Sequence, residues 1–342
     1  MTSRRGGALL VVGDVVTDIV ARHGAPLAPG TDTAAAIRTL PGGAGANVAC
    51  WAASRGCGDV RLLGRVGADS AAWHEEALRR AGVRPRLVVD SEAPTGTVIC
   101  LVDGGAGGAG GAGGGGSRGA GSAGGLAERT FLSDGGASLR LSEADWSPDL
   151  LDGVGWLHLS GYLFFAGPSR GAAAAALAAA RARGVPVSVD PASAGFLAGF
   201  GAERFLAAVQ GVEVLLPSEG EVRVLAGARG LSGTPGLAGA PGVGGGVRGA
   251  GVVEVAGVLS RRFPAVVVKR GAAGALVAQG GEVRAEVPAL PAAARDSTGA
   301  GDAFTGAFLA ARLGGAGLCE ASAEGCRAGA RAVGVVGGRP PG

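Results

Sequence analysis

The chain has 342 residues, which is enough for one large α/β domain or two ordinary ones. Its hydrophobic content of 47% comes with only 4% aromatic residues, and no run approaches the ~18 consecutive apolar residues of a membrane-spanning helix. The formal net charge of +3 comes from Arg residues spread along the chain without a basic block. Membrane and nucleic-acid partners are therefore not expected.

The cysteines and the first residues indicate a cytoplasmic protein. The five cysteines contain no C-x-x-C pair, which fits reduced thiols and argues against a structural zinc site. Arg4 and Arg5 precede an apolar run, but Asp14 and Asp18 interrupt it, so a secretory signal is not expected.

Short apolar runs, rich in β-branched residues and bounded by Gly or polar residues, predict buried strands. They lie at residues 8–13, 60–63, 97–102, 156–159, 185–189, 212–216 and 265–268. Helical stretches at residues 69–81, 169–183 and 252–262 alternate with several of these strands. The alternation predicts a mostly parallel sheet covered by helices on both faces, which is a three-layer α/β/α sandwich.

Two Gly-rich tracts interrupt the alternation. Residues 104–125 join two strand-like runs within the segment 93–134, and such a composition cannot offset its ordering entropy by burial. We therefore expect a mobile loop at a hairpin tip, and the GxGxxG match inside it carries no weight. The second tract, residues 226–251, has Gly at every third position from 227 to 242. Both tracts are expected to be insertions in a single domain that spans residues 1–342.

The strongest chemical signal is the segment DSTGAGDAFTGAFLAARL, which starts at Asp296. Apolar residues in its second half recur with helical spacing, so a helix is expected to begin near Gly301. Gly299, Ala300 and Gly301 then form a turn at a helix N-terminus, where backbone amides and the helix dipole can hold a phosphoryl group. Asp302 lies beside that anion, where it suits a base for an incoming hydroxyl better than a phosphate ligand.

An isolated Gly-Ala-Gly-Asp would be an ordinary helix start, but two further motifs accompany it. The residues PGGAGAN lie at positions 41–47, and Asp14 and Asp18 follow the first predicted strand. Together with D-S-T-G-A-G-D, close to the signature D-T-x-G-A-G-D, they resemble the ribokinase-like sugar kinases, the PfkB carbohydrate kinase family. The motifs stand in family order over roughly residues 8–340.

The resemblance implies a ribokinase-like fold with a small β-sheet lid over the substrate, built from about residues 15–40 and 93–134. It also implies an ATP-dependent phosphotransferase that phosphorylates an alcohol group of a small sugar or related carbohydrate. Asp302 would be the general base, ionised at neutral pH because the ordinary pKa of a carboxyl group is near ~4. The turn at residues 299–301 would be the anion hole.

The same resemblance implies which residues contact the sugar. Gly42 and Gly43 would border it through close backbone approach, while Asn47 and Asp18 would hydrogen-bond its hydroxyls. A plain loop for the glycines, a helix cap for Asn47 and a solvated carboxylate for Asp18 are the simpler alternatives.

ATP and Mg²⁺ are the cofactors that the resemblance implies. Glu221 stands where the Asn-x-x-Glu motif of the family organises Mg²⁺ and phosphates, usually through water, and Ser218 replaces the Asn. Lys269 and Gly271 follow a predicted strand at the place where the family contacts ATP phosphates. A solvated strand end is the alternative for Lys269.

Further expectations concern a monovalent cation and the substrate. Asp296 and Thr298 match the loop that binds such a cation in many members, so K⁺ is a third expected ligand. Ribose kinases carry Asn and Lys where this chain has Val16 and Ala44, so ribose itself is disfavoured, while ketohexoses, keto-deoxy sugar acids and nucleosides stay open. Arg129, on a predicted lid strand, is a candidate to read an acidic sugar.

Two alternative functions stay open. One is a nucleoside kinase of the same fold, and the other is a non-catalytic sugar-binding protein that keeps the fold without turnover. Ser218 favours the second alternative, whereas the intact Asp302 opposes it. Lids of this family often pair between subunits, so a homodimer through the lid is also expected.

Overall fold

The computed structural model describes residues 6–103, 129–228 and 251–341. The mobile loop expected at residues 104–125 lies outside the described residues, as does most of the tract at 226–251. The central sheet consists of β1 (Ala8–Val12), β4 (Val60–Gly67), β5 (Val83–Asp90), β8 (Val154–Ser160), β9 (Val187–Asp190), β10 (Val214–Leu215), β11 (Ala265–Lys269), β12 (Ala275–Gln279) and β13 (Glu282–Val287).

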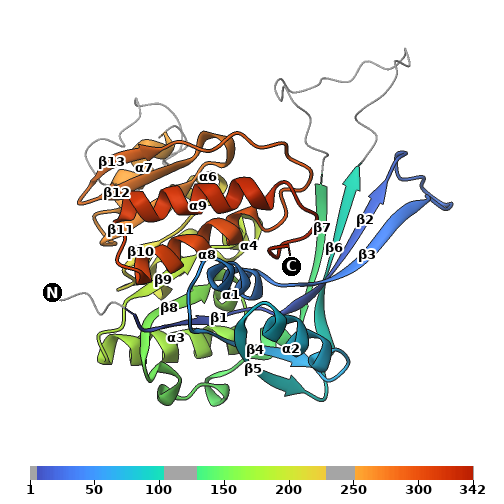
Figure 1. The fold of residues 1–342 in the computed structure, drawn as a ribbon, viewed down its shortest axis with the longest axis horizontal. Helices are drawn as coiled ribbons and strands as arrows, with labels where there is room; N and C mark the ends of the chain where they lie inside the picture. The colour runs from blue at the N-terminus through green and yellow to red at the C-terminus, as the bar shows by residue number, and fades with distance from the viewer. Residues whose placement is uncertain (1–5, 104–128, 229–250, 342) are drawn as a thin grey trace, which may run out of the picture.

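The strand order of this sheet is β13-β12-β11-β10-β9-β8-β1-β4-β5 (Figure 1). The seven strands from β11 through β5 in this order run parallel to one another. Within the described part of this sheet, the antiparallel pairings are β11 with β12 and β12 with β13. The mostly parallel sheet expected from the sequence is therefore confirmed. β5, β12 and β13 were not predicted. The residues of β5 and β13 alternate or are exposed, whereas β12 has a short buried apolar run that was overlooked in the sequence.

Helices cover both faces of the sheet, which confirms the α/β/α layers (Figure 1). Alternate residues of β1 explain the two cores, because Leu9 and Val11 point to one face and Leu10 and Val12 to the other. The first face packs on α1 (Ala44–Ser54), α2 (Ala71–Arg80), α8 (Ala300–Leu313) and α9 (Leu318–Ala332), and the second on α3 (Gly167–Ala182), α4 (Ala194–Phe200), α5 (Ala202–Ala208), α6 (Glu219–Leu225) and α7 (Val252–Leu259).

Short 3₁₀ helices complete the connections: η1 (Ala137–Arg140), η2 (Glu143–Asp145), η3 (Pro148–Leu151), η4 (Gly161–Phe164) and η6 (Gly271–Ala273). In the described part of the chain, no helix has both the length and the apolar character that a bilayer crossing requires.

A second, smaller sheet projects from the body of the molecule (Figure 1). Its order is β3-β2-β6-β7, and β1 leads into it directly through three residues. The small β-sheet lid that the resemblance implies is therefore confirmed. The four strands are β2 (Val16–His23), β3 (Ala35–Gly42), β6 (Thr95–Asp103) and β7 (Arg129–Gly136).

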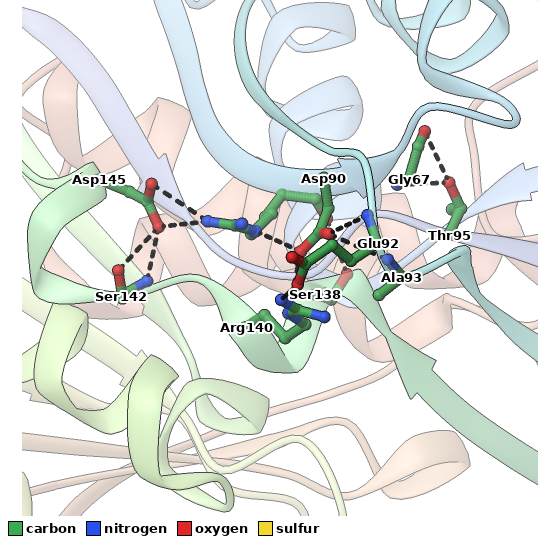
Figure 2. A network of polar contacts seen from close by, with 10 residues as sticks. Gly67, Asp90, Glu92, Ala93, Thr95, Ser138, Arg140, Ser142 and Asp145 are labelled. Atoms are coloured by element: carbon green, nitrogen blue, oxygen red, sulfur yellow. Dashed lines mark hydrogen bonds and ion pairs between the residues drawn. The ribbon is translucent and has the colours of Figure 1, made fainter.

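A polar network ties the base of the lid to the central sheet (Figure 2). Arg65 on β4 and Arg140 after β7 each bond to Oδ2 of Asp90, at 2.9 and 3.0 Å. The Asp90 Oδ1 atom accepts hydrogen bonds of 2.9 and 3.0 Å from the amides of Glu92 and Ala93, which lead into β6. These contacts, the Glu92 amide first, lower the pKa of Asp90 to about 2. Asp90 thus anchors both ends of the lid hairpin.

We expect the Asp90→Asn variant to lower the Tm by several degrees at pH 7, because Arg65 and Arg140 both lose their buried carboxylate partner and keep only Asp145 and Glu92. The pKa of Asp90 is lower when folded than the ~4 of an unfolded chain, so its stabilisation is complete above that pH. This stabilisation is lost as the pH falls through about 2, and the Tm values of wild type and variant should become equal there. Glu92→Gln, which removes only the 74% exposed partner of Arg140, is the matched control and should lower the Tm much less. Equal Tm values for Asp90→Asn and wild type at pH 7 would show that Asp90 does not anchor the lid.

Candidate active site

Helices α1 and α8 bring two distant sequence motifs together. The helices approach closely because Gly306 has no side chain: an added Cβ would lie 2.5 Å from the carbonyl oxygen of Val48. Asn47 on α1 donates from Nδ2 to Oδ2 of Asp302 on α8, at 2.9 Å. Asn47 is buried, and its Oδ1 has no hydrogen-bond partner among the described residues. The amide therefore orients the carboxylate and keeps a buried acceptor for a further group.

The pKa of Asp302 is raised to about 7. Burial is the largest cause, and repulsion from Asp190 and Asp14 adds to it, whereas Asn47 and Lys269 act in the opposite direction. The expectation of a fully ionised carboxylate at neutral pH is therefore corrected, because the ordinary value of ~4 ignores burial. Near pH 7 the group is poised to release or accept a proton.

This pKa predicts a pH dependence. For a reaction that uses Asp302 as a base, kcat/KM should rise about tenfold per unit below pH 7 and level off above it. Folding stability has the opposite sign: the raised pKa favours the protonated folded state, so wild type should lose stability as the pH rises through about 7. Tm values of wild type and Asp302→Asn, measured against pH, separate this contribution from other groups. A rate profile that stays flat below pH 7 would contradict the assignment.

The turn at residues 299–301 opens helix α8, which begins at Ala300, one residue from the expected start. Gly299 adopts a left-handed conformation with φ of 71°, and a Cβ there would lie 2.4 Å from the Cα of Gly338. A Cβ on Gly301 would lie 3.5 Å from Nζ of Lys269. Small residues, the N-terminal amides of α8 and the ammonium of Lys269 thus lie close together, an arrangement that suits an anionic group.

Lys269 is not a solvated strand end. Its side chain is 12% exposed, and its Nζ pairs with Oδ2 of Asp190, which also accepts a 2.9 Å hydrogen bond from Oγ1 of Thr305. Burial favours the neutral amine, but Asp190 and Glu221 outweigh it and raise the pKa of Lys269. Lys269 is therefore a fixed positive charge beside the turn, in the region where a phosphate contact was predicted.

Ser218 and Glu221 form a capping box at the start of α6. The Ser218 amide donates to Oε2 of Glu221 at 2.7 Å, and the Glu221 amide donates to Oγ of Ser218 at 3.3 Å. Glu221 is buried, which raises the pKa of its carboxyl group, while Lys269 opposes the rise. Ser218, which stands where the resemblance implies Asn, therefore holds the carboxylate of Glu221 in place. Gly271 opens η6 with φ of 55°, two residues after Lys269.

The predicted sugar residues lie where the lid joins α1. A Cβ on Gly42 would lie 2.2 Å from Cγ of Asp18, and one on Gly43, whose φ is 99°, would lie 2.5 Å from the carbonyl oxygen of Asp14. Burial and then Asp14 raise the pKa of Asp18 to about 7. Nη2 of Arg339 donates to the Gly42 carbonyl at 3.4 Å. The structure thus brings Asp18, Gly42 and Gly43 together.

Asp14, the other acidic residue after β1, has a structural role. Its carboxylate accepts hydrogen bonds from the amides of Ala44 and Gly45 at 2.6 and 3.2 Å, and from Oγ of Ser160 at 2.8 Å. It holds the first turn of α1, and therefore the position of Asn47 on that helix.

Asp296 and Thr298 lie in the loop before α8. Oδ1 of Asp296 accepts from the Thr298 amide at 2.8 Å, and Oδ2 accepts from the Gly337 amide at 3.0 Å. Arg129 on β7 pairs with Oδ1 at 3.1 Å. Burial opposes ionisation, but Thr298, Gly337 and Arg129 outweigh it and hold the pKa of Asp296 below its usual range. Arg129, a candidate to read an acidic sugar, therefore contacts Asp296 in this structure.

Sequence reasoning missed Asp190, Tyr162 and Arg339. Asp190 ends β9, and a carboxylate at the carboxyl end of a predicted parallel strand was an available signal. The pKa of Tyr162 in η4 is raised by burial and then by Asp14 and Asp302, so its ring lies at the site, but no sequence pattern marks it. Arg339 lies in a coil segment after the last helix, where spacing carries no information.

Comparison with known proteins decides the family. The sequence profile of the pfkB family of carbohydrate kinases matches residues 8–108 and 122–341. The chain belongs to this family. A fructokinase from Klebsiella pneumoniae is 29% identical over 315 residues, which cover 89% of this chain and 84% of the fructokinase.

Solved structures share the fold of this carbohydrate kinase. An adenosine kinase from Sinorhizobium meliloti has a TM-score of 0.76 at 20% identity, over 98% of this chain and 96% of that chain. A ribokinase from Thermotoga maritima has a TM-score of 0.73 at 24% identity, over 97% of this chain and 94% of that chain. An E. coli protein assigned provisionally as ribokinase II was solved with ATP and Mg²⁺. It has a TM-score of 0.74 at 22% identity, over 97% of this chain and 94% of that chain. These likenesses support the ribokinase-like fold of the pfkB kinase and leave its substrate open.

Proposed function

We propose that this carbohydrate kinase transfers the γ-phosphoryl group of ATP to an alcohol group of a small sugar or related carbohydrate, with Asp302 as general base. The hydrogen bond between Asn47 and Asp302, 2.9 Å long, is the observation that carries the proposal. It joins the motif predicted to bind the sugar to the acid that directly follows the predicted phosphate-binding turn.

The contacts support a division of labour around the reacting oxygen. Asp302 would accept the alcohol proton, while the Asn47 amide holds its carboxylate in place and offers Oδ1 to a sugar hydroxyl. The amides at residues 299–301 and the ammonium of Lys269 would stabilise charge on the transferring phosphoryl group. Asp18, beside Gly42, would bind another hydroxyl from the lid side.

The acidic groups beside Lys269 fit Mg²⁺. Asp190 and Glu221 are hard oxygen donors, and both interact with the ammonium of Lys269. The cluster therefore offers carboxylates to a metal ion and a positive charge to the phosphates. When bound with ATP, Mg²⁺ would neutralise phosphate charge. Glu221 would hold it through water, with Ser218 fixing the carboxylate, and Gly271 would border the phosphates.

The first acceptor to test is a ketohexose, because the relative from Klebsiella pneumoniae is named a fructokinase. Val16 and Ala44 stand where ribose kinases of the family carry polar residues, so we expect a lower kcat/KM for ribose. A nucleoside is the second candidate, since the adenosine kinase from Sinorhizobium meliloti shares the fold.

An assay of ADP release with a panel of acceptors tests the proposal. The panel contains fructose, ribose, adenosine and a keto-deoxy sugar acid, and calorimetry measures the binding of each. Turnover of a sugar supports the proposal, and turnover of adenosine alone assigns a nucleoside kinase. Binding without turnover for every compound that binds would identify a non-catalytic sugar-binding protein.

The proposal also includes a homodimer through the lid in a cytoplasmic protein. Large apolar side chains are exposed on the two edge strands of the lid: Ile37 on β3 is 65% exposed, and Phe131 and Leu132 on β7 are 50% and 54% exposed. The five cysteines are free thiols, as expected in a reducing compartment. We expect sedimentation to show a dimer, and a monomer at every concentration would contradict it.

A further inference from the structure

The buried carboxylate of Asp296 holds two backbone segments beside the phosphate turn. One oxygen accepts the amide of Thr298, directly before the turn, and the other accepts the amide of Gly337. Gly338 follows, and it packs so closely on Asn47 that an added Cβ would lie 2.3 Å from Nδ2. A displaced Asp296 would therefore disturb both the turn and the residue that orients the base.

A carboxylate that is 1% exposed needs a positive charge at close range. The family resemblance predicts a monovalent cation at Asp296, but the structure supplies the guanidinium of Arg129. Its Nη1 lies 3.1 Å from Oδ1 of Asp296 and 2.5 Å from Oγ of Ser297, and its side chain is 7% exposed. A K⁺ ion at the same oxygen would lie against this guanidinium and be repelled. The residues present therefore do not fit a monovalent cation while Arg129 is in place.

The ion pair also connects the lid to the phosphate turn. Arg129 is the first residue of β7 and pairs with Val102 on β6, and β6 in turn pairs with β2, the strand that carries Asp18. A single side chain of the lid thus neutralises the loop that precedes α8. This contact joins the lid to the loop before α8, in addition to the Asp90 network at the base of the lid.

We propose that Arg129 takes the place of the monovalent cation at Asp296, so that this kinase needs no K⁺ and its lid supplies the charge that orders the phosphate turn. Arg129 is then a positioning residue that acts through Asp296. The effect on rate rests on the proposed kinase function, whereas the effect on melting temperature does not.

The test compares K⁺ with tetramethylammonium, which is too large for the position, at equal ionic strength. Wild type should show the same Tm in both salts and a kcat within about twofold. Arg129→Ala should melt lower in tetramethylammonium and lose at least about tenfold in kcat, the factor for one hydrogen bond to a charged group. K⁺ should restore both values, because the vacated position then admits the ion. Arg38→Ala, at an exposed arginine of lid strand β3, is the control and should behave as wild type.

A wild type that requires K⁺ for its full Tm or rate would overturn the proposal, as would an Arg129→Ala variant with wild-type Tm in tetramethylammonium. Arg129→Lys keeps the charge and should stay independent of K⁺. The double variant Arg129→Ala/Asp296→Asn removes both charges, so it should not respond to K⁺ even if Arg129→Ala fails to fold. A K⁺ response of that double variant would also overturn the proposal. Because the melting measurements need no substrate, they decide the matter even if no acceptor is turned over.

Discussion

The Asp302→Asn variant should lose phosphoryl transfer, with kcat reduced by roughly 10²- to 10⁴-fold, the range for a general base. The amide has the same shape as the carboxyl group and its oxygen can accept from Nδ2 of Asn47, but it cannot take a proton from the alcohol. Calorimetry should therefore show sugar and ATP affinities close to those of wild type. The Tm above pH 7 should rise, because a buried carboxylate with a pKa raised to about 7 has been removed.

Asp149→Asn is the matched control, since the side chain of Asp149 is 85% exposed and lies on η3, away from the predicted site residues. It should leave kcat unchanged. Full turnover by Asp302→Asn would exclude Asp302 as the base, and loss of sugar binding with unchanged kcat would assign it to substrate recognition.

Gly299→Ala should have the second largest effect. The residue has φ of 71°, where an L side chain is strained, and the new Cβ would lie 2.4 Å from the backbone of Gly338. The backbone of Gly338 cannot move aside as a flexible side chain can, so the turn at residues 299–301 has to shift. We expect kcat to fall by roughly 10²- to 10³-fold, as when a donor of an anion hole is lost, with a smaller change in sugar affinity.

Gly171→Ala is the control for this substitution. Gly171 lies in α3, where an added Cβ meets nothing within 4 Å, and alanine should stabilise the helix by about 1 kcal/mol. Its kcat should equal that of wild type. Wild-type kcat and ATP affinity in Gly299→Ala would show that the turn does not hold the phosphoryl group.

The turn at residues 299–301, the acid that follows it and the layers of the fold could be predicted because short, continuous segments of the sequence specify them. Gly299, Gly301 and Asp302 stand within four residues, followed by a helical period, so one local pattern contains the turn, the helix start and the acid. Gly42, Gly43 and Asn47 are equally local. Continuous apolar runs identified most strands of the parallel sheet, since both faces of these strands are buried.

Partners that come from distant segments could not be predicted. Lys269 was recognised, but its partner Asp190 is 79 residues away, and Arg129 meets Asp296 only through the lid. The pKa of Asp302 depends on burial and on the carboxylates of Asp190 and Asp14, which come from two other segments, so the ordinary pKa of an aspartate did not apply. In each case the missing information is which strand ends meet, and that follows from the order of strands in the sheet.

The most direct measurement is ³¹P NMR of the protein with ATP, Mg²⁺ and an acceptor sugar. The predicted spectrum gains a phosphomonoester signal of the sugar, and the amount of sugar phosphate equals the amount of ADP formed. Asp302→Asn should form both products far more slowly. Formation of ADP with inorganic phosphate alone, or unchanged ATP in the presence of a sugar shown to bind, would contradict phosphoryl transfer to an alcohol at this site.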